Sequence, residues 1–164
     1  MFSSLSPFTK LHVVISLIGI GSGLVVMFGL LAGKKLNRLT ALFLISTVAT
    51  SVTGFFFPFH GVTPAIVVGI ISMVLLAVAI VARYARHLAG AWRWIYVVTA
   101  MISLYLNVFV LVVQLFQRVP ALKALAPTQS EPPFAVTQLV VLALFVLLTI
   151  VAVIKFRGEQ LRAG

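Results

Sequence analysis

Five long apolar runs divide the chain, and short connectors richer in polar residues separate them. The runs cover residues 11–32, 39–57, 62–82, 95–116 and 135–154. A run of about 20 apolar residues is long enough to cross the hydrocarbon core of a bilayer as a helix. The pattern therefore predicts an all-α fold, a polytopic transmembrane helix bundle with five spans, formed by residues 1–164 as a single integral membrane domain.

Two features of the runs affect this count. The first run is longer than the apolar region of a signal peptide, and "LLAGKK" offers no good small-x-small cleavage site, so we expect a retained span. Between the second and third runs, Pro58, Gly61 and Pro64 indicate a tight turn. If that turn stayed buried, the two runs would form a hairpin rather than two spans.

The connector before the last run carries its own helix signals. Pro120 suits the first position of a helix and Pro127 can end it, which predicts a short interfacial helix on the membrane surface. Ser130 is expected to cap the last span, with Glu131 in the first turn, where an acid is favoured by the helix dipole.

Composition agrees with a membrane protein. The chain is 62% hydrophobic and only 9% charged, which is too little charge for a soluble domain of this length. The formal net charge of +10 would suggest nucleic acid in a soluble protein. Here the basic residues form short clusters between apolar runs, so we expect the bilayer, and not nucleic acid, as the partner.

The basic residues also predict an orientation. With five spans, nine of the twelve Lys and Arg residues fall on one side and three, Lys10, Arg118 and Lys123, on the other. Because basic residues favour the cytoplasmic side, the N-terminus is predicted outside and the C-terminus in the cytoplasm. Trp92, Trp94 and Tyr96 are expected to form an interfacial aromatic belt beside one basic cluster.

The fourth run carries a stripe of polar residues. Their spacings of three, four, four, seven and three place them on one face of a helix. An amide facing lipid would lack hydrogen-bond partners, so the stripe should face protein or a wet cavity. We favour interhelical hydrogen bonds, and the alternative is a ligand site or water-lined pathway. The stripe comprises Tyr96, Thr99, Ser103, Asn107, Gln114 and Gln117.

Small and hydroxyl residues offer partner faces for this stripe. In the second run, Thr47 and Ser51 share a face and are the expected neighbours of Asn107 and Gln114. In the first run, Gly19 and Gly23 form a GxxxG motif, which predicts close helix packing.

Three residues suggest a cofactor hypothesis. His12 and His60 are expected at similar depth on adjacent helices, where they could ligate a b-type haem, or a divalent metal together with Glu131. Two membrane-interface histidines are the simpler interpretation, and we prefer it.

Other chemistry is excluded by composition. The chain has no Cys and no Asp, so it cannot form a disulfide, a thiolate metal site or an aspartyl protease. The predicted spans hold no carboxylate, which excludes a relay of acids through the membrane. We therefore expect a protein that is not an enzyme.

Residues 105–134, "YLNVFVLVVQLFQRVPALKALAPTQSEPPF", resemble multi-pass inner-membrane proteins of bacteria that have no assigned activity, and the likeness extends to "RHLAGAWRWIYV". The resemblance implies a bacterial cytoplasmic (inner) membrane and transfers no functional residue.

Two functional hypotheses follow. The first is a non-enzymatic bundle, serving as a partner subunit or a small transport or ligand-binding protein, with a membrane-protein partner or homo-oligomerisation expected. The second is a membrane redox protein that binds haem b through His12 and His60.

Overall fold

The computed structural model describes residues 2–58 and 61–162, together with the side chains of most of them, and all its regular elements are helices. A short 3-10 helix, Phe2–Ser4, precedes the first long helix, and a π-helical turn, Val81–Ala85, extends the third. No strand occurs within the described ranges. The α-helices are α1 (Pro7–Leu31), α2 (Asn37–Gly54), α3 (Pro64–Ile80), α4 (Trp92–Arg118), α5 (Pro120–Leu125) and α6 (Pro132–Arg162).

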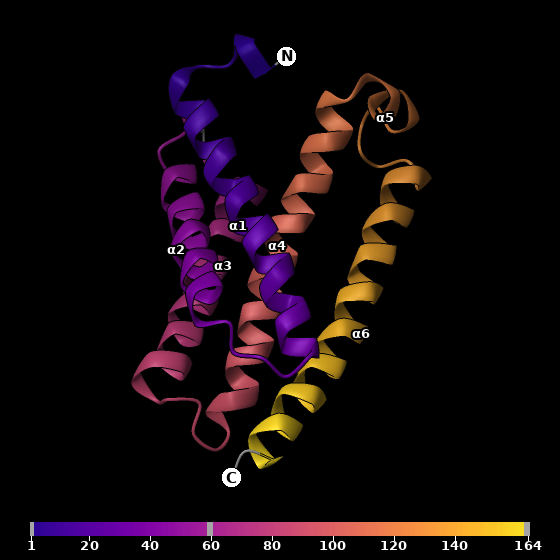
Figure 1. Ribbon diagram of the computed structural model, residues 1–164. Coiled ribbons are helices and arrows are strands. Elements are labelled where there is room, and N and C mark those ends of the chain that lie inside the picture. The colour runs from indigo at the N-terminus through magenta and orange to yellow at the C-terminus, as the bar shows by residue number, and fades with distance from the viewer. Residues whose placement is uncertain (1, 59–60, 163–164) are drawn as a thin grey trace.

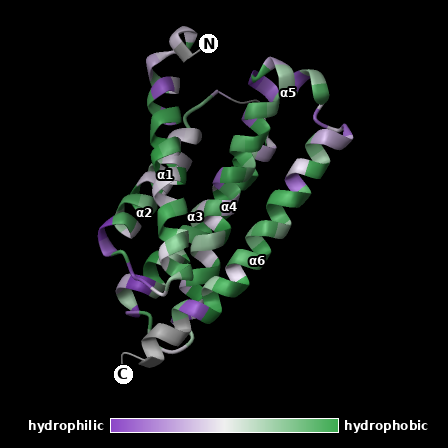
Figure 2. Ribbon diagram, turned by 45° about the vertical axis from the view of Figure 1, so that its right-hand side comes forward, coloured by the Kyte–Doolittle hydropathy of each residue, from purple (hydrophilic) through white to green (hydrophobic). Residues whose placement is uncertain are grey.

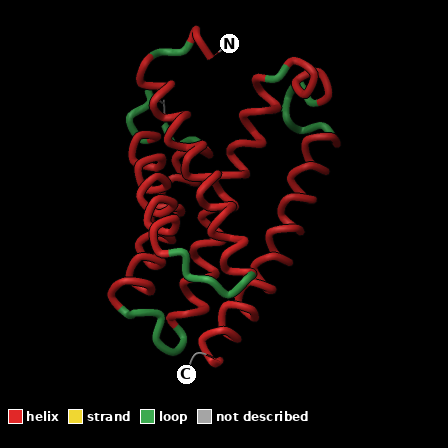
Figure 3. Tube along the Cα trace, in the orientation of Figure 1, coloured by secondary structure: helices red, strands yellow, loops and turns green. Residues whose placement is uncertain are grey.

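The long helices run alternately in opposite directions, and the two termini lie at opposite ends of the bundle (Figure 1). α4 is the central helix, because it contacts α1, α3, α5 and α6, while α1 packs most extensively against α2. The described loops lie at the two ends of the bundle (Figure 3). Hydrophobic residues cover most of the helix length, and hydrophilic residues gather mainly toward the ends (Figure 2).

Four helical segments are long and apolar enough to cross a membrane: residues 7–31, 64–85, 92–118 and 132–156. They correspond to four of the five predicted spans. The second predicted span forms α2, which lies in the bundle but is less apolar, because it begins with Asn37 and Arg38 and carries six hydroxyl residues. The count of five spans therefore stays a prediction.

Three of the six hydroxyl residues of α2, Ser46, Thr50 and Thr53, bond to carbonyls of the same helix. Ser46 Oγ donates to the Leu42 carbonyl over 2.6 Å, and Thr50 Oγ1 donates to the Ser46 carbonyl over 2.8 Å. A side chain that bonds to a carbonyl one turn back needs no water. This arrangement lets a polar sequence pack inside a bundle.

Glycines set the approach of α1 to its neighbours. A Cβ at Gly19 would lie 3.3 Å from both Ser46 Oγ and Thr47 Oγ1, and a Cβ at Gly23 would lie 2.6 Å from Leu104 Cδ1. The predicted close packing at this GxxxG motif is confirmed. The motif brings α1 against α2 and also, through Gly23, against the central helix α4.

The aromatic belt was predicted wrongly at one position. Trp94 is 51% exposed, as a residue facing lipid should be, but Tyr96 is 0% exposed and belongs to the core. The reason is the helical period, because two positions along α4 turn the side chain away from Trp94 by about 200°. Tyr96 packs there with Phe156 of α6, their ring centroids 6.3 Å apart.

The start of α6 also differs from the prediction. The carbonyl of Glu131 accepts from the Ala135 N–H over 3.3 Å, so the N-cap position belongs to Glu131 and not to Ser130. Ser130 Oγ lies 2.6 Å from Thr128 Oγ1 instead. The cap needs little help, because Pro132 and Pro133 have no N–H to satisfy.

The predicted short helix in this connector does form, as α5, and none of its residues is buried. Its position on a membrane surface stays a prediction.

Candidate functional site

Thr99 and Ser103, in the first half of the polar stripe, make their hydrogen bonds within α4. Thr99 Oγ1 donates to the Ile95 carbonyl over 2.7 Å, and Ser103 Oγ donates to the Thr99 carbonyl over 2.8 Å. Both side chains are buried, Ser103 completely. Their hydroxyl protons are therefore donated to backbone carbonyls of α4, and the two residues contribute to helix packing.

The middle of the stripe reaches α2 as predicted. Asn107 Nδ2 donates to Thr47 Oγ1 over 3.4 Å, and Thr47 is fully buried where α2 faces Gly19 of α1. Ser51 lies one turn further along α2 and is also buried. The Asn107–Thr47 contact is long for a hydrogen bond, which fits interhelical contact better than a rigid binding site.

The last two residues of the stripe do not reach α2. Gln114 Oε1 accepts from Arg118 Nε over 2.8 Å on the same helix, and Gln117 Nε2 donates to Gln129 Oε1 over 3.2 Å. The prediction that Gln114 faces α2 is wrong. Near the end of a span, a long amide finds a neighbouring polar group within its own helix or connector.

Two glutamines that sequence reasoning did not select bond to the backbone of α4. Gln138 Nε2, from α6, donates to the Phe109 carbonyl over 3.3 Å, and Gln129 Nε2 donates to the Val113 carbonyl over 3.1 Å. Gln138 is buried, and its Oε1 has no hydrogen-bond partner among the described residues. The sequence signal was available, because Gln138 is the only carboxamide between residues 135 and 154.

Of the three proposed metal or haem ligands, the structure describes His12 and Glu131. His60 lies outside the described residues. Glu131 accepts from Thr128 Oγ1 over 2.7 Å and from the Ser130 N–H over 3.1 Å. The bond from the Thr128 hydroxyl is the main reason that the pKa of Glu131 lies below its usual value. Within the described part of the chain, no group of three or more His, Asp or Glu side chains is placed to hold a metal.

His12 contacts α2 through its Nδ1 atom. Its Nδ1 lies 2.7 Å from Thr53 Oγ1, and Thr53 Oγ1 also lies 2.7 Å from the Ala49 carbonyl, to which it donates. A hydroxyl has one proton, so when Thr53 donates it to Ala49, His12 Nδ1–H is the donor to Thr53. Nε2 then carries the lone pair.

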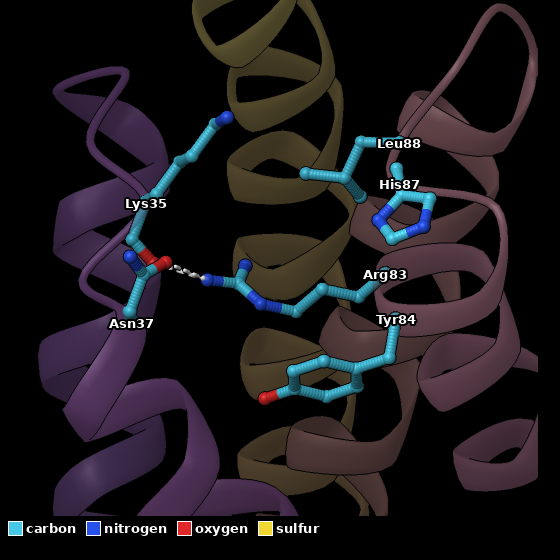
Figure 4. A pocket seen from close by; sticks show the side chains of 6 residues that line it. All are labelled: Lys35, Asn37, Arg83, Tyr84, His87 and Leu88. Atoms are coloured by element: carbon cyan, nitrogen blue, oxygen red, sulfur yellow. Dashed lines mark hydrogen bonds between the residues drawn. The ribbon is translucent and has the colours of Figure 1, made fainter.

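A different polar site lies at the opposite end of the bundle from His12 and Glu131. A pocket of about 200 Å³ opens between the α1–α2 connector and the turn that follows α3. Figure 4 shows Arg83 reaching from the π-helical turn to the segment that holds Lys35 and Asn37. The lining residues are Lys35, Asn37, Arg83, Tyr84, His87 and Leu88.

Arg83 organises this pocket, although it is only 7% exposed. Its Nη2 donates to Asn37 Oδ1 over 2.7 Å and to the Lys35 carbonyl over 3.1 Å. The same carbonyl accepts from Thr40 Oγ1 over 3.0 Å, so three segments of chain meet at one oxygen. Nη1 is buried and has no partner among the described residues.

Aromatic rings cover the guanidinium of Arg83. Its central carbon lies 5.2 Å from the ring centroid of Tyr96 and 5.9 Å from that of Tyr84. The Tyr96 hydroxyl lies beside Thr40 and Arg83 but has no hydrogen bond of good geometry. Tyr96, the first residue of the predicted stripe, therefore packs against the guanidinium of Arg83. The stripe on α4 thus extends to the residues that hold this pocket.

Strained backbone surrounds the same pocket. Leu36, His87 and Leu88 have positive φ angles of 42°, 51° and 58°, and Arg83 lies within the π-helical turn. Non-glycine residues rarely adopt this conformation, and such strain and π-turns gather at functional sites. Of the four non-glycine residues with positive φ in the described chain, only Gln129 lies elsewhere.

The connector from α1 to α2 forms the side of the pocket that faces Arg83. Gly33, with φ of 73°, ends α1 in a Schellman turn, in which Lys34 N–H donates to the Gly29 carbonyl over 2.7 Å. Leu36 then packs on Gly29, where a Cβ would overlap Leu36 Cδ1. This turn aims the Lys35 carbonyl at Arg83.

Sequence reasoning missed this pocket because Arg83 was treated only as a marker of orientation. One signal was present: Arg83 directly follows an apolar run, four residues before His87. No known protein family, curated protein or solved structure matches the chain.

Proposed function

We propose that this chain is a non-enzymatic integral membrane protein that binds a small polar ligand in the pocket around Arg83. The observation that carries the proposal is a buried arginine with an unpartnered Nη1, held in place by strained backbone from two connectors. A polar group buried without a partner costs free energy, and a bound ligand is one way to satisfy it.

Binding is a better proposal than catalysis. The charged residues that line the pocket are all basic, and no carboxylate is among the six lining residues. Hydrolysis by general acid–base catalysis uses groups that can donate and accept protons near neutral pH. The six lining residues include one histidine and no carboxylate, so the pocket lacks a matched acid and base.

The proposed topology has five spans, with α2 included, and places the pocket on the cytoplasmic side of a bacterial inner membrane. The alternating helices bring the α1–α2 connector, the α3–α4 connector and the end of α6 to one end of the bundle (Figure 1). These segments contain nine of the twelve Lys and Arg residues, and basic residues favour the cytoplasmic side.

Single cysteines in this Cys-free chain test the orientation. Ala91 and Ser130 are exposed at opposite ends of the bundle. In intact cells, Ser130→Cys should react with an impermeant maleimide, and Ala91→Cys should react only after the membrane is opened. Reaction of Ala91→Cys from outside would overturn the orientation.

Native mass spectrometry of the purified protein tests ligand binding. We expect a small molecule to co-purify with the wild type and to be lost in Arg83→Lys, since lysine cannot reproduce the guanidinium fork. Arg86→Lys is the matched control, because Arg86 is exposed and stacks on Trp92 at 5.4 Å. His87→Gln provides a second pocket variant if Arg83→Lys does not fold. Bound molecules that are unchanged in both pocket variants would contradict the proposal.

Haem binding is a second candidate, and the tautomer of His12 supports it. With Nδ1–H donated to Thr53, Nε2 is the nitrogen left to bind iron, and this is the arrangement seen in metal-binding histidines. The expected result is a Soret band in protein expressed with ample haem, lost in His12→Ala. Colourless protein under those conditions would exclude haem b.

A further inference from the structure

The chemistry of the pocket around Arg83 identifies its ligand more closely. We infer that the pocket binds a phosphate group, through Arg83 with Lys35 beside it. The inference rests on the proposed ligand-binding role of this pocket, and it adds the chemical class of the ligand.

The first step of the argument is charge. Arg83 is 93% buried and always ionised, and its neighbours in the pocket include Lys35 and His87 but no acid. The chain has only two acids. Glu131 lies at the other end of the bundle and is occupied by Thr128. Glu159 lies in the last turns of α6, where the structure describes no side chains.

The second step is that neutral contacts do not balance a buried charge. Two hydrogen bonds through Nη2 and two aromatic rings stabilise the guanidinium, but each supplies only partial negative charge. A buried ion is tolerated when it is paired. A bound anion would supply the missing charge and accept hydrogen bonds from the fork.

The third step is the size and surroundings of the pocket. Its volume of about 200 Å³ is below the roughly 300–1,000 Å³ of sites that enclose a whole drug-sized ligand, so it suits a small group. Arginine recognises phosphate oxygens in a bidentate manner, and lysine adds a point charge. Basic pockets between membrane helices on the cytoplasmic side bind lipid head groups. The phosphate can therefore come from a phospholipid or from solution.

The test compares lipids that differ in the phosphate. Delipidated protein in detergent is titrated with short-chain phosphatidylglycerol, with diacylglycerol of the same chains, and with inorganic phosphate, and binding is followed by native mass spectrometry and thermal stability. We expect one tight phosphatidylglycerol site and no equivalent site for diacylglycerol. Stabilisation by inorganic phosphate without phosphatidylglycerol binding would assign the phosphate to a soluble source.

Two lysines provide matched variants. Lys35 lines the pocket and Lys34 does not, and both are exposed at adjacent positions. Lys35→Gln should weaken binding about tenfold, the effect of one charge-assisted bond of about 1.4 kcal/mol, and Lys34→Gln should change it less than twofold. Equal losses in both variants would show that only surface charge is sensed and would overturn the inference.

Two further outcomes contradict it. Diacylglycerol that binds as tightly as phosphatidylglycerol would show that the phosphate is not recognised. The Glu159→Gln variant is the second case. If it binds phosphate more than tenfold tighter than the wild type, Glu159 is the partner of Arg83 in the unliganded protein. A co-purified ligand that depends on Arg83 but contains no phosphate would overturn this inference and leave the proposed function intact.

Discussion

Arg83 Nη2 donates to Asn37 Oδ1 over 2.7 Å, and this bond joins two residues that are 46 positions apart in the chain. It connects the π-helical turn after α3 to the first residue of α2. The two connectors at the basic end are therefore held by one buried cation. The partners of Arg83 therefore add to the apolar contacts that Leu30 and Leu88 make at this end.

The first prediction concerns that bond. Asn37→Ala should lower the free energy of unfolding by about 1.5–3 kcal/mol, because a hydrogen bond to a charged group is lost and Arg83 stays buried. Arg38→Ala is the control, since Arg38 is an exposed neighbour, and its effect should stay within about 0.5 kcal/mol. Unfolding in mixed micelles measures both. Equal effects would show that Asn37 does not hold Arg83.

The second prediction uses two glycines of α1. A Cβ at Gly23 would lie 2.6 Å from Leu104 Cδ1 and 2.8 Å from Phe43 Cδ1, whereas a Cβ at Gly21 would meet nothing within 4 Å. Gly23→Ala should therefore cost about 1–3 kcal/mol by overpacking. Gly21→Ala should stabilise the helix by about 0.5–1 kcal/mol. A neutral Gly23→Ala would show that α1 can move away from α4 without loss.

The third prediction separates two amides of the polar stripe. Asn107→Leu should cost about 0.5–2 kcal/mol, because it removes the contact with Thr47 of α2. Gln114→Leu should cost less than about 0.5 kcal/mol, because its partner is the exposed Arg118 on the same helix. Steric trapping or denaturant unfolding measures the difference. A larger loss for Gln114→Leu would mean that Gln114 has a partner outside this chain.

The fourth prediction concerns the start of α6. Ser130→Ala should change stability by less than about 0.5 kcal/mol, because Ser130 precedes the N-cap and bonds only within its loop. Ser6→Ala is the comparison, since Ser6 Oγ accepts from the Thr9 N–H over 3.2 Å at the start of α1. That loss should cost about 0.5–2 kcal/mol. The reverse order would restore Ser130 as the cap.

The fifth prediction is a pH dependence at Glu131. The bond from the Thr128 hydroxyl holds the pKa of Glu131 below its usual value, so the ionised form favours the folded loop. Its contribution is present above the unfolded pKa and is lost as the pH falls through the folded pKa. Relative to Glu131→Gln, the wild type should therefore lose its advantage in melting temperature on acidification.

Thr128→Val is the matched change for this titration. It removes the hydroxyl that donates to Glu131, so the advantage over Glu131→Gln should shrink and should disappear at a higher pH. A wild type that gains stability over Glu131→Gln as the pH falls would contradict the direction of the pKa shift.

The sequence by itself determined the helical architecture. Apolar runs of membrane length, separated by Gly, Pro and basic connectors, placed the five long helices to within a few residues, apart from the extension of α6 into its basic tail. Gly19 and Gly23 also predicted close packing correctly, since a motif of two small residues one turn apart has one main use in an apolar helix. These features depend on local spacing, which is written directly in the chain.

Only the tertiary structure decided which polar groups meet. The stripe on α4 was regular in sequence, yet Asn107 reaches α2 while Gln114 turns to Arg118. Likewise, nothing in the local sequence shows that Arg83 is buried or that Lys35 and Asn37 accept its hydrogen bonds. The physical reason is that a long polar side chain chooses among all partners within its reach, and those partners are brought by the packing of other helices and by the strained turns between them.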